Sequence, residues 1–252
     1  MKNIVSVIVT VALIFSCCFI GNVFAADTAN VWDGTTLTAP KDSDGDGVKE
    51  IGIAEEFAWL GVNGGNDSYI LTNDIFLNDL VVDVSGDDVV LKKFDGTVIT
   101  DTSTLNIWSG AATFGGTLDG NGYTVNGMFN NTDSELGTKR AMFGELKSTK
   151  HSVIKNIEVL NTYFAGATYQ AVFFGNDIGS WTTATIDNCH VENVYLSSSL
   201  KEDNYTHPTV GGLVGYIQAG HLNVNNVVIK NAEVTNTGIG FMSKDKILEL
   251  LK

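Results

Sequence analysis

An eight-residue pattern recurs three times in the second half of the chain, and it constrains the fold more than any other feature. The pattern has the form apolar-x-Asn-apolar-x-apolar-x-Asn. It occurs at residues 154–161 (IKNIEVLN), 186–193 (IDNCHVEN) and 224–231 (VNNVVIKN), so successive copies begin 32 and 38 residues apart. A weaker copy begins at Val125, with Gly127 in the place of the first Asn. Internal repeats of this length are typical of solenoid folds.

A short apolar segment that ends in Gly precedes each of the three copies, at Gly144, Gly175 and Gly215. Around its central Asn the octapeptide nearly alternates apolar and polar residues, which indicates a half-buried strand. Asn tolerates the left-handed backbone of a corner and can bond to the same Asn one repeat away. One unit cannot bury its apolar face alone, whereas stacked units share a core. We therefore predict an all-β fold, a parallel β-helix (β-solenoid), over the alternative of a β-sandwich.

Residues 1–25 have the features of an export signal. Lys2 precedes an apolar run over residues 4–20, and residues 23–25 (VFA) supply a cleavage site. We expect a secreted or cell-surface protein with no membrane span in the mature chain. A lipoprotein is the weaker alternative, because Phe15 is a poor fit shortly before Cys17. Cleavage would leave Cys189 as the last cysteine, which predicts a buried, unreactive thiol and no internal disulfide.

The charge balance narrows the classes of partner. The net charge is −14, with 29 Asp and Glu against 15 Lys and Arg, and Arg140 is the only Arg. Nucleic acid and anionic lipid are bound by clustered cations, so neither is an expected partner. We expect the partner to be a glycan or a cell-surface protein.

Several segments resemble those of a known family. Residues 211–216 (GGLVGY), followed by the strand from Val224, resemble the GLUG motif of secreted and surface bacterial proteins. Residues 114–125 are similar to the segment that opens the first full rung of such proteins, and residues 53–75 to their N-terminal region. Two copies depart from the motif, with Met142-Phe143 and Phe173-Phe174 in place of its Gly-Leu start. The resemblance implies a parallel β-helix with adhesin-like or surface roles, and it brings no catalytic residues.

An acidic loop is the sharpest chemical signal. Residues 42–47 (DSDGDG) place carboxylates at alternate positions before a Gly, as a calcium loop does. We predict Asp42, Asp44 and Asp46 as calcium ligands, together with the backbone carbonyl of Val48 and with Glu50. The twelfth position is Ile53, so the usual bidentate Glu is missing, and we expect weak, structural Ca²⁺ binding. The alternative is a polar turn.

Aromatic residues in or beside the segments between strands are the predicted binding residues: Trp181, Tyr163, Tyr169, Tyr195 and Tyr205. Aromatic faces stack on sugars and anchor interfaces, although such residues can also cover the core. Polysaccharide cleavage, by a lyase or a hydrolase, is the rival function. It would need carboxylates to converge with Lys139 or Arg140, and the sequence pairs none of them. Asp187 and His190 are predicted on opposite faces of a strand.

The predicted organisation has four parts: a signal peptide (1–25), an N-terminal cap region with the Asp-rich loop (26–110), the GLUG-type β-helix repeats (111–240) and a C-terminal amphipathic helix (241–252). That helix either caps the open end of the solenoid or marks the chain as a fragment of a larger adhesin. We expect a non-catalytic binding or adhesion role and no enzymatic activity. A purely structural spacer is the other alternative.

Overall fold

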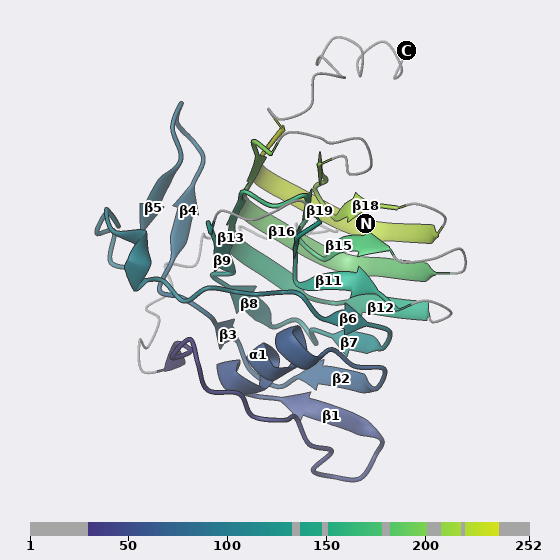
Figure 1. The fold of residues 1–252 in the computed structure, drawn as a ribbon. Helices are drawn as coiled ribbons and strands as arrows, with labels where there is room; N and C mark the ends of the chain where they lie inside the picture. The colour runs from purple at the N-terminus through teal and green to yellow at the C-terminus, as the bar shows by residue number, and fades with distance from the viewer. Residues whose placement is uncertain are drawn as a thin grey trace, which may run out of the picture.

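The computed structural model describes residues 30–132, 137–147, 151–177, 182–200, 208–217 and 220–236. These residues form a parallel β-solenoid of about three turns, which confirms the predicted fold class (Figure 1). The predicted signal peptide, the predicted C-terminal helix, Trp181 and Tyr205 lie outside the described residues.

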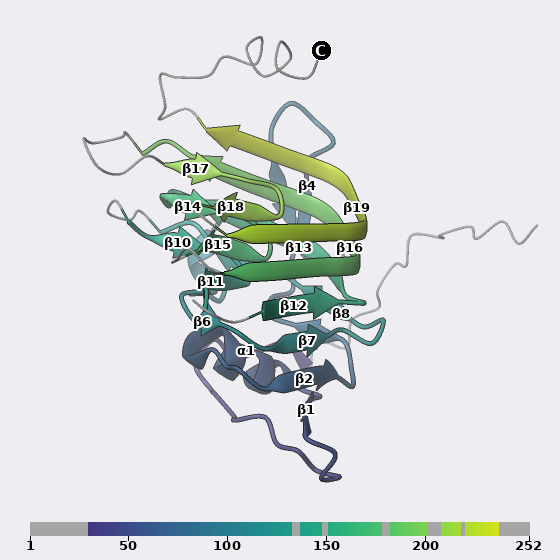
Figure 2. The ribbon, with the colours of Figure 1, turned by 90° about the vertical axis from the view of Figure 1, so that its right-hand side faces the viewer.

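Strands lie in four stacks along the solenoid axis, of which the third and fourth, with four and three strands, are shorter than the first two (Figure 2). One full turn of the chain is called a rung. The first stack contains β1 (Val48–Ile51), β2 (Ser68–Leu71), β7 (Thr117–Asp119), β12 (His151–Lys155) and the first halves of β16 (Thr183–Ser198) and β19 (His221–Asn236). The second contains β3 (Ile75–Phe76), β8 (Thr124–Asn126), β9 (Phe129–Asn130), β13 (Glu158–Ala165) and the second halves of β16 and β19. The third contains β6 (Thr113–Phe114), β11 (Phe143–Leu146), β15 (Phe174–Asp177) and β18 (Val214–Tyr216), and the fourth β10 (Lys139–Arg140), β14 (Tyr169–Gln170) and β17 (Thr209–Val210).

The three strong copies of the octapeptide stack in register. Ile154 pairs with Ile186, which pairs with Val224, and all of these strand pairs are parallel. The predicted alignment of the weaker copy is wrong. Val125 pairs with Val159 rather than with Ile154, because an extra turn at residues 120–123 shifts the register. Gly127 therefore takes the place of the second Asn of the pattern, where the backbone is again left-handed.

Two left-handed Asn residues in each long strand set which side chains enter the core. Asn188 and Asn193 have φ angles of 52° and 58°, and each turns the chain at a corner. Inward-facing residues therefore follow steps of three and two along β16: Ile186, Cys189, Val191, Val194 and Leu196. Strict alternation fails at each corner, which explains why the sequence shows only near-alternation.

The Gly that ends each short apolar segment is required for space. A Cβ at Gly215 would lie 2.5 Å from the carbonyl oxygen of Gly175, and one at Gly175 would lie 2.9 Å from that of Gly144. None of the three has a positive φ, so close stacking of the backbone, rather than a left-handed turn, excludes a side chain here. Beside this column, Phe114, Phe143 and Phe174 stack in the core, with the first two ring centroids 4.2 Å apart.

The N-terminal part closes one end of the solenoid. Helix α1 (Ala54–Asn63) buries Phe57, Ala58 and Leu60 against the core beside β1 and β3. Strands β1 to β3 already pair with the same sheet, because β2 pairs with β7 and β3 with β8. The antiparallel hairpin of β4 (Val81–Asp83) and β5 (Val90–Lys92) stands beside the second stack and forms a separate apolar cluster with it (Figure 1). A short 3₁₀ turn, η2 (Thr102–Thr104), follows.

Candidate functional site

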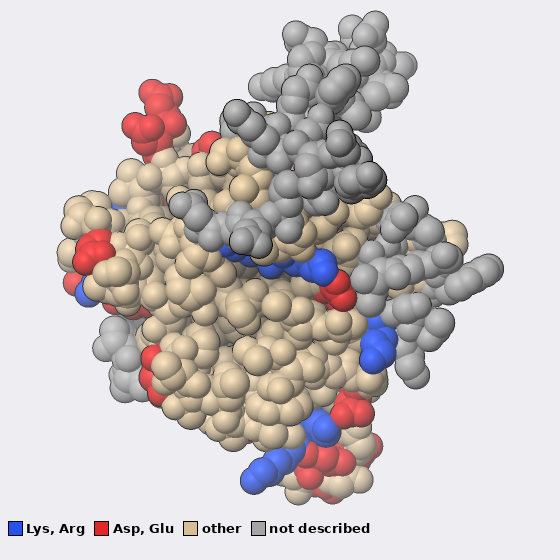
Figure 3. Space-filling view, viewed as in Figure 1, with Lys and Arg blue, Asp and Glu red and all other residues tan. Residues whose placement is uncertain are grey.

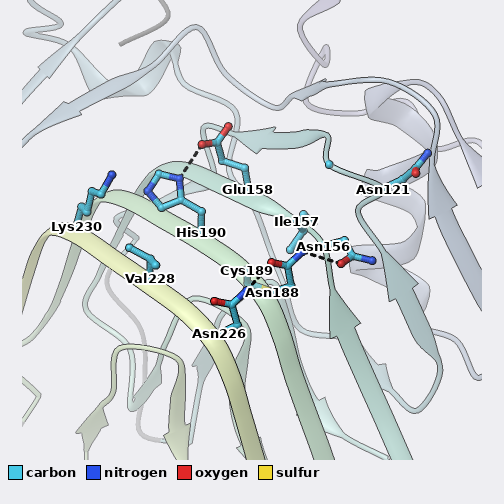
Figure 4. Close-up of a pocket in the computed structure, with 11 residues that line it drawn as sticks. Asn121, Asn156, Ile157, Glu158, Asn188, Cys189, His190, Asn226, Val228 and Lys230 are labelled. Carbon is cyan, nitrogen blue, oxygen red and sulfur yellow. Dashed lines mark hydrogen bonds and ion pairs between the residues drawn. The ribbon is translucent and has the colours of Figure 1, made fainter. Parts of the chain in front are cut away.

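An open groove runs over the corner between the first and second stacks (Figure 4). Its volume is about 570 Å³. Three successive rungs, in β12–β13, β16 and β19, and the turn before β8 supply its walls. The lining residues are Asn121, Gly122, Asn156, Ile157, Glu158, Asn188, Cys189, His190, Asn226, Val228 and Lys230.

A column of Asn side chains forms one side of the groove. Asn188 Nδ2 donates to Asn156 Oδ1 at 2.9 Å, and Asn226 Nδ2 donates to Asn188 Oδ1 at 2.8 Å. The column ends on Asp119, whose Oδ1 accepts from Asn156 Nδ2 at 3.0 Å. Each amide has two N–H donors, and the column uses one of them. The column therefore leaves the second N–H of each amide for other hydrogen bonds, at one position per rung.

The register places charged and polar side chains in a second column. Glu158, His190 and Val228 occupy the same position in β13, β16 and β19, and Leu160, Glu192 and Lys230 occupy the position two residues later. His190 Nδ1 lies 2.8 Å from Glu158 Oε1, and its Nε2 lies 3.2 Å from Glu192 Oε2. The imidazole of His190 therefore lies between carboxylates of two rungs: Nδ1 forms a hydrogen bond with Glu158, whereas Nε2 lies within ion-pair distance of Glu192.

Further hydrogen bonds fix both carboxylates. Glu158 Oε2 accepts from Thr124 Oγ1 at 3.1 Å, and Glu192 Oε1 accepts from Asn231 Nδ2 at 3.3 Å. Both Glu side chains and His190 are partly buried, with about a fifth to a third of each exposed. The arrangement offers oriented hydrogen-bond acceptors for hydroxyl groups, beside the exposed side chain of Val228.

Sequence reasoning missed this cluster because the left-handed Asn188 breaks the alternation. Ile186 and Cys189 both enter the core, so Asp187 and His190 both lie on the outer surface. The predicted placement of these two residues on opposite faces is therefore wrong. The repeat offsets were the available signal, because positions 158 and 190 differ by the same 32 residues as the first two octapeptides.

Cys189 lies beneath the groove with its thiol buried. Desolvation raises the pKa of this thiol from 9.0 to about 11, despite hydrogen bonds that act in the opposite direction. At neutral pH the group is a neutral thiol, and the thiolate is the reactive form. The prediction of a buried cysteine is confirmed, and its low reactivity stays a prediction.

The acidic loop brings together three of its predicted calcium ligands. One oxygen each of Asp42, Asp44 and Glu50 lies within 4.8 Å of the others. Asp46 does not join this group: its Oδ1 accepts from the backbone N–H of Val48 at 2.8 Å. Val48 is the first residue of β1. Figure 3 shows acidic side chains gathered at this end of the molecule, whereas most of the face in view is uncharged.

The loop carboxylates also accept hydrogen bonds from the loop's own backbone. Asp42 accepts from the N–H groups of Gly45 and Gly47, at 2.7 and 2.9 Å, and Glu50 accepts from that of Ser43 at 2.9 Å. The loop thus holds a compact set of oxygen atoms, the ligand type that calcium takes. Calcium binding stays a prediction.

The three predicted aromatic residues that the structure describes, Tyr163, Tyr169 and Tyr195, do not line the groove. Tyr163 stacks between Phe129 and Tyr195, with ring centroids 5.4 and 4.8 Å apart, and both Tyr rings pack against the cluster under the β4–β5 hairpin. Tyr169 lies on another stack, with its ring centroid 5.5 Å from that of Tyr216. The described aromatic residues therefore support the packing of separate surfaces rather than a single platform.

The basic residues considered for a lyase lie away from the groove. Lys139 forms an ion pair with Glu145. Arg140 is buried, and its guanidinium donates to the carbonyl oxygen of Thr132 and to Thr132 Oγ1, the latter at 2.9 Å. Neither side chain converges with Glu158 or with Glu192.

Comparison with protein-family models, with curated proteins and with solved structures finds no match to this chain. The likeness to the GLUG motif therefore stays a resemblance carried by the residues quoted above. Over the described ranges, no helix has both the length and the apolar character needed to cross a membrane.

Proposed function

We propose that this protein is an exported surface or extracellular module whose groove binds a neutral glycan without cleaving it. The observation that carries the proposal is the Asn column, which presents one amide per rung along an open groove. Adjacent strands lie about 4.8 Å apart, so the same donor recurs at that interval. This interval is close to the length of one sugar residue in an extended glycan.

The chemistry of the groove suits hydroxyl groups. The outward N–H groups of Asn156, Asn188 and Asn226 are donors, and the carboxylates of Glu158 and Glu192 are acceptors. Val228, which is 46% exposed, offers an apolar contact for the C–H face of a sugar ring. A chain of sugars lying along the solenoid axis would meet an amide donor in each of the three rungs, a carboxylate acceptor in two of them and apolar surface at Val228 in the third.

The contacts of the two carboxylates in the groove favour binding without cleavage. A glycosidase holds two carboxyl groups across a space that admits the glycosidic bond and, in many cases, a water molecule. In this groove the imidazole of His190 contacts both carboxylates, with Nδ1 2.8 Å from Glu158 Oε1 and Nε2 3.2 Å from Glu192 Oε2. The imidazole occupies the space between them. Polysaccharide cleavage is the rival function, and a structural spacer is the second rival.

The test uses the chain without its predicted signal peptide, residues 26–252, and a panel of insoluble neutral polysaccharides. Depletion of the protein from solution measures binding, and the appearance of new reducing or unsaturated sugar ends measures cleavage. We expect depletion without new ends. Val228→Asp should weaken binding at least tenfold, whereas Val62→Asp, at an equally exposed position on α1 outside the groove, should leave it unchanged.

Two results would overturn the proposal. Release of new sugar ends that is lost in Glu158→Gln would make the groove an active site. Equal binding by the Val228→Asp and Val62→Asp variants would place the ligand elsewhere on the molecule. Absence of binding to every neutral glycan would leave a cell-surface protein as the partner and would refute the glycan assignment.

A further inference from the structure

The last described strand leaves the end of the core uncovered. In β16, the inward-facing side chains of Ile186, Val191 and Leu196 are fully buried. Their register partners in β19 are Val224, Ile229 and Val234, which are 45%, 43% and 43% exposed. Each position changes from buried to half-exposed because the described residues add no rung beyond β19. The result is a strip of aliphatic side chains along a 16-residue strand.

A second pair of left-handed Asn residues, Asn193 and Asn231, stacks in the same way as the column of Asn156, Asn188 and Asn226, and both columns continue toward the outer side of this strand. In each column the amide nitrogen donates toward the preceding rung, and the amide oxygen accepts from the following one. Asn226 and Asn231 are the last members, and no described residue donates to their Oδ1 atoms from beyond β19. Apolar side chains and hydrogen-bonding atoms therefore both face the same uncovered end.

The opposite end of the solenoid is closed, so one copy cannot simply stack head to tail on another. The outer side of β1 carries an antiparallel bridge between Lys41 and Glu50, and that of β3 carries a bridge between Val31 and Phe76. Helix α1 covers the core beside them. Of the two ends of the large sheet, as far as the described residues form it, the β19 end presents a strand whose outer side pairs with no other described strand.

We propose that residues 237–252 of the same chain cover this end and prevent β19 from pairing with a second copy. They follow Asn236 directly, and the tether gives them a high local concentration at the strip. Nearly half of them are apolar, among them Ile239, Phe241, Ile247, Leu248, Leu250 and Leu251. The interspersed residues Lys244, Asp245, Lys246 and Glu249 can keep the outer side of such a cover in water.

A free strand edge beside exposed Val and Ile side chains is a site for edge-to-edge association. A cover supplied by the chain itself removes that site without a partner. The proposal concerns the end of the solenoid and makes no use of a ligand in the groove. Its test is therefore independent of the glycan proposal.

The experiment compares the full chain with a variant that lacks residues 237–252. Mass by light scattering after size exclusion gives the oligomeric state, and hydrogen exchange with mass spectrometry follows the amides of β19. We expect a monomer with protected β19 amides for the full chain. The shortened chain should self-associate with rising concentration, or show exchange at least tenfold faster in β19 when dilute.

A second variant covers the case in which the shortened chain does not fold. In the full chain, the double change Leu248→Asp and Leu251→Asp should speed exchange in β19 and promote association. The matched control makes the same change of −2 in net charge at polar positions, as Lys244→Gln with Lys246→Gln, and should do neither. If the full chain is itself a dimer with β19 protected, a second copy covers the end and the proposal is wrong. Unchanged mass and exchange in both tail variants would also refute it.

Discussion

Replacement of Asn188 by Ala tests whether the Asn column stabilises the solenoid and sets its corner. The side chain of Asn188 donates to Asn156 Oδ1 and accepts from Asn226 Nδ2. Each hydrogen bond contributes about 1 kcal/mol to stability, and these are at an exposed position, so their joint loss costs about 1–2 kcal/mol. Ala at a φ of 52° adds roughly 1–2 kcal/mol of left-handed strain. We expect a total loss of about 3 kcal/mol.

Two companion variants separate these contributions. Asn188→Gly loses the hydrogen bonds but tolerates the left-handed backbone, so it should be less destabilised than Asn188→Ala, by up to about 1 kcal/mol. Asn225→Ala is the control, because Asn225 is an exposed Asn with a negative φ in the strand that pairs with this position. It should stay within about 0.5 kcal/mol of the parent chain.

Urea unfolding followed by far-ultraviolet circular dichroism measures the free energy of unfolding of all four chains. The reasoning fails if Asn188→Ala is no less stable than Asn225→Ala. Equal losses of stability in Asn188→Ala and Asn188→Gly would also contradict it, because the left-handed backbone at this corner would then add no strain to Ala.

Three further outcomes follow from the structure. If the acidic loop binds Ca²⁺, millimolar Ca²⁺ should raise the midpoint of thermal unfolding. Asp44→Asn should abolish this rise and Asp46→Asn should reduce it less, because Asp44 belongs to the group of converging oxygens and Asp46 does not. Thermal unfolding of each variant with and without Ca²⁺ measures the effect. The Cys189 peptide should resist alkylation at pH 8 in the native state and react quickly in denaturant, because burial raises the pKa of its thiol to about 11. The pKa of Asp33 is lowered from 3.8 to about 2, chiefly by a hydrogen bond from the side chain of Thr36. The ionised carboxylate should therefore stabilise the folded chain above pH 4, and this stabilisation should be lost as the pH falls toward 2. Acid titration of Asp33→Asn should show a shallower loss of stability over that range, and an unchanged slope would contradict the assignment.

The repeat predicted the architecture because it records the stacking directly. Residues such as Ile154, Ile186 and Val224 occupy one inward position, and their recurrence fixed both the strand type and the parallel register. Prediction failed where the chain length between equivalent positions changed. Before β8, the added turn at residues 120–123 displaced the weaker copy, and Gly127 and Asn161 proved equivalent because both tolerate a left-handed backbone.

The β4–β5 hairpin could not be placed from the sequence, and that had consequences for the predicted site. From their own strands alone, Tyr163 and Tyr195 are predicted to contact a ligand. Their outer faces are instead packed by a hairpin that is more than 70 residues away along the chain. No local pattern records such a contact, because the hairpin's apolar residues would suit any exposed face of comparable size.

The sequence predicts the groove in part. Its columns follow from arithmetic on the repeat, since adding 32 and then 38 to position 158 gives His190 and Val228, and the same steps from position 160 give Glu192 and Lys230. The outward direction of these side chains follows as well, once a left-handed Asn is counted as an interruption of the alternation. The contacts between the columns do not follow, because His190 is long enough to meet either a neighbour on its own strand or one on the next rung. It contacts both, Glu192 on its own strand and Glu158 on the preceding rung. Repeat arithmetic therefore locates a candidate surface, whereas side-chain geometry decides what chemistry that surface can perform.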